Sequence, residues 1–363
     1  MTPDWTHFRT ALLAWYRPER RPMPWKAITD PYRIWLSEII LQQTRVAQGR
    51  PYYERFVDAY PTVRDLAAAP DDEVMKLWEG LGYYSRARNL LRAARTVAAD
   101  HDGRFPDTYA GLLALPGVGP YTAAAIASFA FDRPTPVLDG NVFRILARYA
   151  DDATPMDTGP GKRHFADLVD AALGDAAARR FNQAIMDFGA LVCKPKVPAC
   201  ATCPLAGKCG ARGAGTVAER PVKAKRLTRR TRYFHYLVVE DPGGQTLIEQ
   251  RRDKDIWRDL YQFPLVEVDR GEVVTAELAG HPAWPAALAP GELDFVHRSA
   301  PRKQQLTHQT IVAVFHHFAL ARPLPRGGAE AYRVVPRAAL SEYAFPRLIT
   351  RYLAEDNQPL SLF

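Results

Sequence analysis

Long apolar runs are missing from this chain of 363 residues. A membrane-spanning helix needs about 18 to 20 mostly apolar residues, and the longest stretch of this kind covers only residues 123–131. The uninterrupted apolar segment of a secretory signal is missing too, because Asp4, His7 and Arg9 interrupt the N-terminus. These absences argue against a membrane protein or an exported one and predict a cytoplasmic location.

Strong compositional bias is absent as well. Hydrophobic residues make up 47% of the chain and charged residues 24%, which predicts a globular fold and argues against a disordered, collagen-like or coiled-coil chain. The length favours two or three domains over one. A net charge of +8 permits a polyanionic partner without proving one.

Cysteine is scarce, and all four residues of this type lie between Cys193 and Cys209. A small secreted scaffold would spread its cysteines through the fold, and a cytosolic chain keeps its thiols reduced, so metal ligation is the better interpretation. Four thiolates can hold either a tetrahedral zinc ion or a [4Fe-4S] cluster. Zinc ligands are usually paired at short spacing, and only Cys200 and Cys203 are, which favours the cluster.

The pattern of apolar residues changes at the cysteines. Before them, apolar residues recur at helical spacing, whereas after them short alternating segments such as 233–240 and 311–318 indicate strands. The pattern predicts a multi-domain chain, with an all-α domain at 1–216 that includes the cysteine loop and an α+β domain at 233–363. The segment 217–232 between them is predicted to be a basic interdomain linker, and its basic run at 223–232 is either solvated or a phosphate contact.

A glycine-rich turn, Leu-Pro-Gly-Val-Gly-Pro at 115–120, precedes a helix that is expected to begin near Tyr121. Gly117 and Gly119 have no Cβ atom, so their backbone can approach a phosphate closely, and the N-terminus of the next helix offers unpaired N–H groups to it. A helix-hairpin-helix uses this feature to hold a DNA backbone. The alternative is a plain turn between two helices.

Two carboxylates occupy positions that suggest chemistry. Glu38 lies in an otherwise apolar helical segment, where burial would raise its pKa toward the value that a general acid needs at neutral pH. Asp139 precedes another helix, where backbone N–H groups would favour its anion. Such a pair suits cleavage of a glycosidic bond, with one proton donor and one anion facing the developing cation. The alternatives are a salt-bridged helical glutamate and an ordinary helix N-cap.

Polar and aromatic side chains on two predicted tight turns could enter a stack of bases. Gln42 and Gln43 follow the helical segment of Glu38, and Tyr83 lies in Gly-Leu-Gly-Tyr-Tyr at 80–84. Side chains of this kind can fill the gap left by an extruded base. Otherwise they are a surface glutamine pair and half-buried tyrosines.

Taken together and in this order, these features resemble the adenine DNA glycosylase family, within the endonuclease III superfamily of helix-hairpin-helix glycosylases. The resemblance runs nearly from end to end. Its motifs are MPW at 23–25, WLSEIILQQTRV at 35–46, WEGLGYYSRARNL at 78–90, LPGVGPYTA at 115–123, VLDGNV at 137–142, FNQAIMDFGALVC at 181–193, and the four cysteines.

The resemblance implies a helical glycosylase domain with a [4Fe-4S] cluster, followed by a Nudix-like domain. It also implies a monofunctional, monomeric enzyme that hydrolyses the N-glycosidic bond of adenine mispaired with 8-oxoguanine or guanine in duplex DNA. Glu38 would be the general acid that protonates adenine N7, and Asp139 would stabilise the sugar cation or capture it covalently. Tyr121 and Asn141 would organise that carboxylate and the sugar.

The matching motifs imply further roles. The residues with these roles are Arg21, Met23, Trp25 and Gln183 around the flipped adenine, Gln43 and Tyr83 as the intercalating pair, Gly117 and Gly119 at a DNA phosphate, and Cys193, Cys200, Cys203 and Cys209 on the cluster. In the C-terminal domain, Leu306, Thr307 and His308 match a Phe-Ser-His segment that lies beside 8-oxoguanine in the family. Thr307 keeps the hydroxyl, but the leucine removes an aromatic face, so discrimination is expected to be weaker.

A lysine is missing where related lyases need one. Endonuclease III-like bifunctional enzymes form a Schiff base through a lysine two residues after the last glycine of the turn, and that residue is Tyr121 here. No lysine lies between Lys76 and Lys162, which argues against the alternative of a lyase acting on oxidised pyrimidines. A non-catalytic iron-sulfur DNA-binding protein, the other alternative, would be expected to lack Glu38 and Asp139. Arg-Glu and Glu-Glu pairs are missing after residue 232, so no pyrophosphohydrolase activity is expected.

Overall fold

The computed structural model describes residues 2–224, 228–286, 288–324 and 332–356. Its contacts divide the chain into two compact units, Met1–Ala69 with Asn89–Arg226 and Pro70–Arg88 with Leu227–Phe363. The segment Pro70–Arg88 is therefore counted with the C-terminal part of the chain, which the predicted boundary at residue 216 did not anticipate. Residues 225–227 of the predicted basic segment lie outside the described residues.

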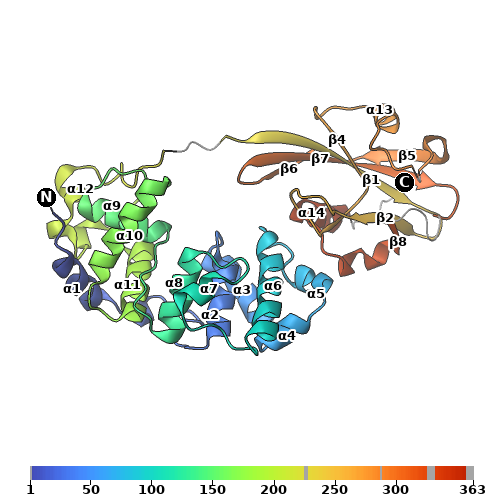
Figure 1. Ribbon diagram of the computed structural model, residues 1–363. Coiled ribbons are helices and arrows are strands. Elements are labelled where there is room, and N and C mark those ends of the chain that lie inside the picture. Colours follow the sequence, from blue (N-terminus) through green and yellow to red (C-terminus); the bar gives the residue numbers. More distant parts are fainter. Residues whose placement is uncertain (1, 225–227, 287, 325–331, 357–363) are drawn as a thin grey trace. The chain divides into compact units, whose positions relative to one another are not determined.

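The first unit is helical throughout its described part, as the sequence predicts (Figure 1). No helix in the described part of the chain is long and apolar enough to cross a membrane. The α-helices of this unit are α1 (Trp5–Trp15), α2 (Pro31–Leu41), α3 (Val46–Ala59), α4 (Val63–Ala68), most of α6 (Ser85–Asp100), α7 (Tyr109–Leu113), α8 (Pro120–Phe131), α9 (Gly140–Ala150), α10 (Gly159–Leu173), α11 (Ala178–Leu191) and α12 (Gly210–Ala214).

Capping residues explain where the helices that carry the candidate site begin. The side chain of Asp30 precedes α2 and accepts a hydrogen bond from the backbone N–H of Tyr32 at 2.9 Å. Helix α8 begins with Pro120, whose lack of an N–H is harmless in the first turn. Asp139 caps α9 with its side chain. A cap of this kind stabilises a helix by roughly 1 kcal/mol.

Helices α2 and α8 pack against each other in the core of the first unit. Trp35 and Leu36 of α2 are fully buried, and so are Ala123 and Ile126 of α8. Small alanine side chains on α8 leave room for the larger side chains of α2, and burial of each large apolar side chain stabilises the fold by roughly 1.5 to 3 kcal/mol. Side chains on these two helices are therefore held in a rigid frame.

The turn between α7 and α8 requires glycine at one of its two positions. Gly117 has a φ of +73°, and a Cβ atom there would lie only 2.5 Å from the Cβ of Asn89. Gly119 differs, because a Cβ atom there would meet nothing within 4 Å. Gly117 makes the tight turn possible, while the open space at Gly119 leaves the backbone accessible before α8.

The second unit contains a mixed eight-stranded sheet, which confirms the predicted α+β class (Figure 1). Strand β1 (Arg230–Glu240) runs parallel to β7 (Gln309–Leu320) and is followed by β2 (Gln245–Gln250) through a hairpin. The other elements are β3 (Tyr261–Gln262), β4 (Leu265–Val268), β5 (Leu293–Arg298), β6 (Arg302–Gln305), β8 (Tyr332–Pro336), α5 (Asp71–Leu77), α13 (Thr275–Ala279) and α14 (Arg347–Asp356).

The predicted basic segment is divided between the two units. Arg148 of α9 donates from Nε to the carbonyl oxygens of Val217 at 3.0 Å and Arg220 at 3.2 Å, so this part belongs to the first unit. Strand β1 already begins at Arg230, because Arg230 pairs with Gln309 of β7. The described part of this segment is therefore bonded to one unit at its beginning and to the other at its end, although most of its residues are exposed.

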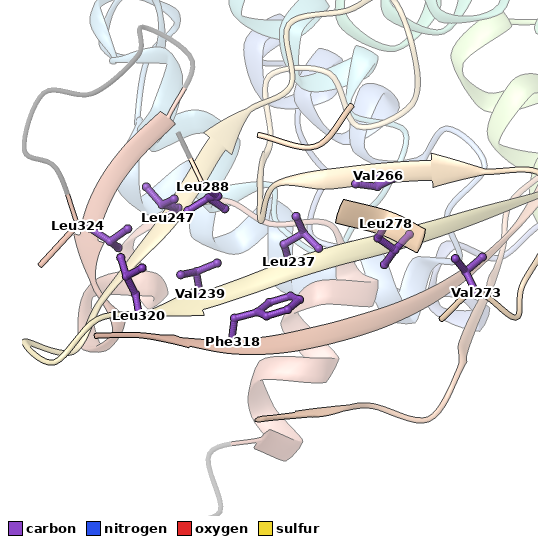
Figure 2. Packing of buried hydrophobic residues seen from close by; sticks show 10 residues of the cluster. All are labelled: Leu237, Val239, Leu247, Val266, Val273, Leu278, Leu288, Phe318, Leu320 and Leu324. Carbon is purple, nitrogen blue, oxygen red and sulfur yellow. The ribbon is translucent and has the colours of Figure 1, made fainter. Parts of the chain in front are cut away.

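Figure 2 shows the core on one face of this sheet, where Leu237 and Val239 of β1 lie near Phe318 of β7. Successive side chains of a strand alternate between faces, so β7 also supplies the opposite face. There, Phe315 stacks on Tyr352 of α14 with 3.6 Å between ring centroids. The sheet is thus packed on both faces.

Candidate active site

A cavity of about 680 Å³ in the first unit, here called the acid-pair cavity, gathers most of the predicted site residues. It is bordered by α2, the start of α8, the start of α9 and α11. The predicted residues that line it are Arg21, Met23, Trp25, Glu38, Gln43, Gly117, Gly119, Tyr121, Asp139, Asn141 and Gln183.

Glu38 projects from α2, and its side chain is buried, with 7% of its surface exposed. Burial raises the pKa of Glu38 to about 7, a hydrogen bond with Tyr121 lowers it, and the nearby Asp139 charge raises it. A carboxyl group with this pKa is protonated in a large fraction of molecules at neutral pH and can give up its proton to a substrate. The salt-bridged alternative receives no support, because no ion pair to Glu38 is among the interactions of the described residues.

Asp139 is held more firmly than Glu38. Its Oδ1 accepts hydrogen bonds from the backbone N–H groups of Asn141 and Val142, both at 2.8 Å, and its Oδ2 accepts one from Asn141 Nδ2 at 2.9 Å. Burial nevertheless raises the pKa of Asp139 above its ordinary value, and these donors oppose the rise. The donors lower the pKa of Asp139, in the direction that the sequence predicts, but burial of the carboxylate outweighs them. The three donors still favour the anion more than the single hydrogen bond at Glu38 does.

Tyr121 lies at the start of α8, beside both carboxyl groups. Burial and the neighbouring charges of Glu38 and Asp139 raise its pKa well above the ordinary value for tyrosine. The phenol therefore stays neutral, and its O–H can donate to Glu38. No amine occupies this position.

Asn141 connects the acid pair to the cysteine loop. Its Nδ2 donates to Asp139, and its Oδ1 accepts from Arg144 Nη2 at 2.8 Å. The same guanidinium donates from Nε to the carbonyl oxygen of Cys193 at 2.8 Å. Arg144 thus fixes the amide that holds Asp139, and it ties that amide to the beginning of the loop.

Two further charged residues in the acid-pair cavity escaped the sequence analysis. Asp187, on α11, is 1% exposed, forms an ion pair with Arg21 at 3.1 Å and makes a short contact with Lys26 Nζ. Lys26 Nζ also donates to the carbonyl oxygen of Arg21 at 2.8 Å. The helical spacing of Gln183 and Asp187 was the one signal that could have pointed to this carboxylate.

A pocket in the second unit, also of about 680 Å³ and here called the Thr307 pocket, holds the predicted site residues of that unit. Tyr83, Thr307 and His308 all line it, and Tyr83 OH lies 2.6 Å from Thr307 Oγ1. Tyr83 is 45% exposed and has a φ of +50°, and Gln43 of the first unit has a φ of +53°. Left-handed backbone at a non-glycine residue is uncommon and is concentrated at functional sites.

The four cysteines lie in one loop of the first unit, as half-buried free thiols. Cys203 interacts electrostatically with each of the other three, and Arg148 Nη1 donates to Cys193 Sγ at 3.4 Å. Within the described ranges, however, no group of three or more His, Cys, Asp or Glu side chains has the arrangement of a metal site. The four cysteines fit an iron-sulfur cluster in donor chemistry and in number, as four soft sulfur ligands in one loop, but the described side chains are not gathered around one point.

Comparison with known proteins agrees with this geometry. Residues 36–158, which include the helical hairpin and Glu38, match the HhH-GPD superfamily of base excision DNA repair proteins. Residues 235–355 match the NUDIX domain. The first unit thus defines a helix-hairpin-helix protein of base excision DNA repair, and the Nudix-like part confirms the predicted fold of the C-terminal region.

Two related proteins show which family within this class the chain belongs to. The adenine DNA glycosylase of Mus musculus is 38% identical over 321 residues, which cover 74% of this chain and 62% of the relative. That of Buchnera aphidicola subsp. Schizaphis graminum is 35% identical over 258 residues, which cover 71% of this chain and 74% of the relative. The chain belongs to the adenine DNA glycosylase family, as its motifs predicted. It spans about 62% of the length of the mouse relative.

A solved structure supports the fold of the first unit. A thermostable thymine-DNA glycosylase, 30% identical in sequence, superimposes with a TM-score of 0.54 and covers 58% of this chain and 97% of its own. The helical glycosylase fold therefore accounts for more than half of the chain.

Proposed function

We propose that this protein is a monofunctional DNA glycosylase that removes adenine mispaired with 8-oxoguanine or guanine from duplex DNA. The observation that carries the proposal is the buried Glu38, whose pKa is raised to about 7, next to Tyr121 and Asp139 in one cavity. Membership in the adenine DNA glycosylase family supports the choice of base.

In the proposed mechanism, Glu38 donates its proton to N7 of the flipped adenine. The bond between C1′ and N9 then breaks, and its electron pair leaves with the base, which departs neutral. Asp139 carries the negative charge that stabilises the developing sugar cation or captures C1′ covalently, and water completes the hydrolysis. Asn141 and two backbone N–H groups keep that carboxylate in place.

Lyase activity is the second candidate function, and the cavity contains an amine after all. Lys26 lines it, although the sequence argument considered only the position of Tyr121. Burial lowers the pKa of Lys26, and the hydrogen bond and charge of Asp187 oppose this shift. The bonds of Lys26 Nζ to Asp187 and to the carbonyl oxygen of Arg21 hold the amine in place and disfavour its attack on C1′. We therefore expect hydrolysis without a Schiff base.

A substrate panel tests the main proposal. Single-turnover base release is measured on duplexes that contain A:8-oxoguanine, A:G or thymine glycol, with and without borohydride. We expect release of free adenine from the first two, strand breaks only after alkali, and little trapped complex. Efficient trapping that is lost in Lys26→Gln would instead establish lyase chemistry through this lysine.

We also propose that the Thr307 pocket reads the base opposite adenine. The Tyr83 and Thr307 hydroxyls lie within hydrogen-bonding distance of each other, so each is already held in place before a base is bound. Thr307 would donate to or accept from 8-oxoguanine, His308 lies beside it, and Tyr83 would enter the stack of bases.

Cys193, Cys200, Cys203 and Cys209 would hold the [4Fe-4S] cluster in the proposed enzyme. When bound, the cluster supplies four metal–thiolate bonds that keep the loop folded. Gly117 and Gly119, which precede α8, would contact DNA phosphates. The lysines of the cysteine loop, Lys194, Lys196 and Lys208, would do the same. Protein isolated without air should contain about four irons per chain, and stoichiometric zinc would contradict the cluster.

A further inference from the structure

Two hydrogen bonds hold the side-chain amide of Gln183 in the acid-pair cavity. Tyr16 OH donates to Gln183 Oε1 at 2.8 Å, and Gln183 Nε2 donates to the carbonyl oxygen of Lys26 at 3.2 Å. A backbone carbonyl can only accept, so Nε2 must face Lys26 and Oε1 must face Tyr16. The orientation of the amide therefore follows from the chemistry of its two partners.

Tyr16 is suited to act as a permanent donor. It follows α1, and its ring is 5% exposed. Burial, together with the nearby charge of Asp187, raises the pKa of Tyr16 to about 12. The phenol keeps its proton at any working pH, so Gln183 Oε1 always meets a donor there.

The carbonyl of Lys26 is fixed as well. The backbone N–H of Lys26 donates to the carbonyl oxygen of Met23 at 3.1 Å, which closes a turn. Its Nζ is bound to the carbonyl oxygen of Arg21 and to Asp187. If the Gln183 amide rotated by half a turn, its oxygen would face this immobile carbonyl oxygen, and the hydrogen bond would become a repulsion.

An amide held in this way can read the edge of a purine. In the described part of the chain, Gln183 has one N–H and one lone pair without a partner. Adenine offers an amino donor at N6 beside an acceptor at N1, whereas hypoxanthine and guanine offer an acceptor at O6 beside a donor at N1. A freely rotating amide suits both patterns, but a fixed one suits only one of them.

We propose that Tyr16 is a positioning residue that fixes the Gln183 amide and thereby gives the cavity its preference for adenine over 6-oxopurines. This inference rests on the proposed excision of adenine, with Gln183 facing the edge of the base that carries N1 and N6. Tyr16 itself touches neither the base nor the sugar.

The test compares single-turnover excision of adenine and of hypoxanthine, each placed opposite 8-oxoguanine. Tyr16→Phe removes only the hydroxyl, and we expect it to lower the ratio of the adenine rate to the hypoxanthine rate roughly two- to twelve-fold, the value of one hydrogen bond. In a Gln183→Leu background the same substitution should leave the ratio unchanged, because its target is gone. The ratio does not depend on the fraction of enzyme that is folded.

Tyr149→Phe is the matched control. Tyr149 is 3% exposed and donates from its hydroxyl to the carbonyl oxygen of Asp4 at 2.8 Å, so the variant loses a comparable bond outside the cavity. It should leave the ratio unchanged. An unchanged ratio in Tyr16→Phe, or an equal fall with and without Gln183, overturns this inference alone. A wild-type protein that releases no adenine overturns the proposed function as well.

Discussion

The acid-pair cavity and the Thr307 pocket have the same volume but differently constructed walls. Glu38 and Asp139 of the cavity are fixed by helix packing and capping, and burial shifts both pKa values. In the Thr307 pocket, Tyr83 and Thr307 lie on turns, and Tyr83 is 45% exposed. Proton transfer needs groups removed from water, whereas reading a base needs hydroxyl groups that a duplex can reach. We therefore expect substitutions in the cavity to have larger effects than substitutions in the pocket.

The largest effect is expected for Glu38→Gln. The variant keeps the size of the side chain but has no proton to donate, so single-turnover excision of adenine should fall by roughly 10² to 10⁴. Binding to the mismatch should change little. Glu54→Gln is the control, since Glu54 is exposed and forms an ion pair with Arg50 at 2.7 Å on the surface of α3. Near-normal excision by Glu38→Gln would remove this residue from the mechanism.

A smaller effect is expected for Thr307→Ala. Loss of a hydrogen bond worth about 1 to 3 kcal/mol should lower the preference for A:8-oxoguanine over A:G by roughly five- to 150-fold, and solvent access favours the lower end. Tyr83→Phe should act in the same direction, because it removes the partner hydroxyl. Thr350→Ala is the control, since its hydroxyl bonds to the carbonyl oxygen of Arg347 and does not line the pocket. An unchanged preference in both pocket variants would place recognition elsewhere.

A further effect concerns stability rather than activity, and here Glu38→Gln should be a gain. Glu38 titrates near 4.5 when unfolded and near 7 when folded, so burying its charge costs roughly 3 kcal/mol above pH 7. The cost is absent below pH 4.5, where both states are protonated, and it grows between pH 4.5 and 7. The variant should melt roughly 6 to 12 °C higher than the wild type at pH 8 and at the same temperature at pH 4. Equal melting temperatures at pH 8 would mean that the ionised carboxylate of Glu38 is not desolvated in the folded protein.

Much of the acid-pair cavity could be predicted from sequence because its main residues depend on local context. A glutamate within an apolar helical segment is bound to be buried, and Asp139 before a helix is bound to act as a cap. The direction of the Asp139 pKa could not be predicted, because desolvation depends on packing by distant segments. Lys26 and Asp187 escaped for the same reason, since they meet only after α11 folds against the N-terminal loop.

Prediction from the sequence is limited in the same way for the second unit. The strands around residues 233–240 and 311–318 followed from alternation, but β1 extends back to Arg230 because its partner β7 is long enough to pair with it. Grouping of Pro70–Arg88 with the C-terminal part rests on contacts such as that between Lys76 Nζ and the carbonyl oxygen of Tyr343 at 3.0 Å. Periodicity in the sequence does not predict a contact between residues so far apart along the chain.

The pH dependence of single-turnover adenine excision tests the central claim most directly. If protonated Glu38 is the acid and its pKa is about 7, the rate should fall nearly tenfold per pH unit above about pH 8, whereas protonation of Asp139 limits the rate on the acid side. The fall follows from loss of the proton that Glu38 must donate. A rate that stays constant or rises between pH 7 and 9, with the protein still folded and bound to DNA, would contradict the claim.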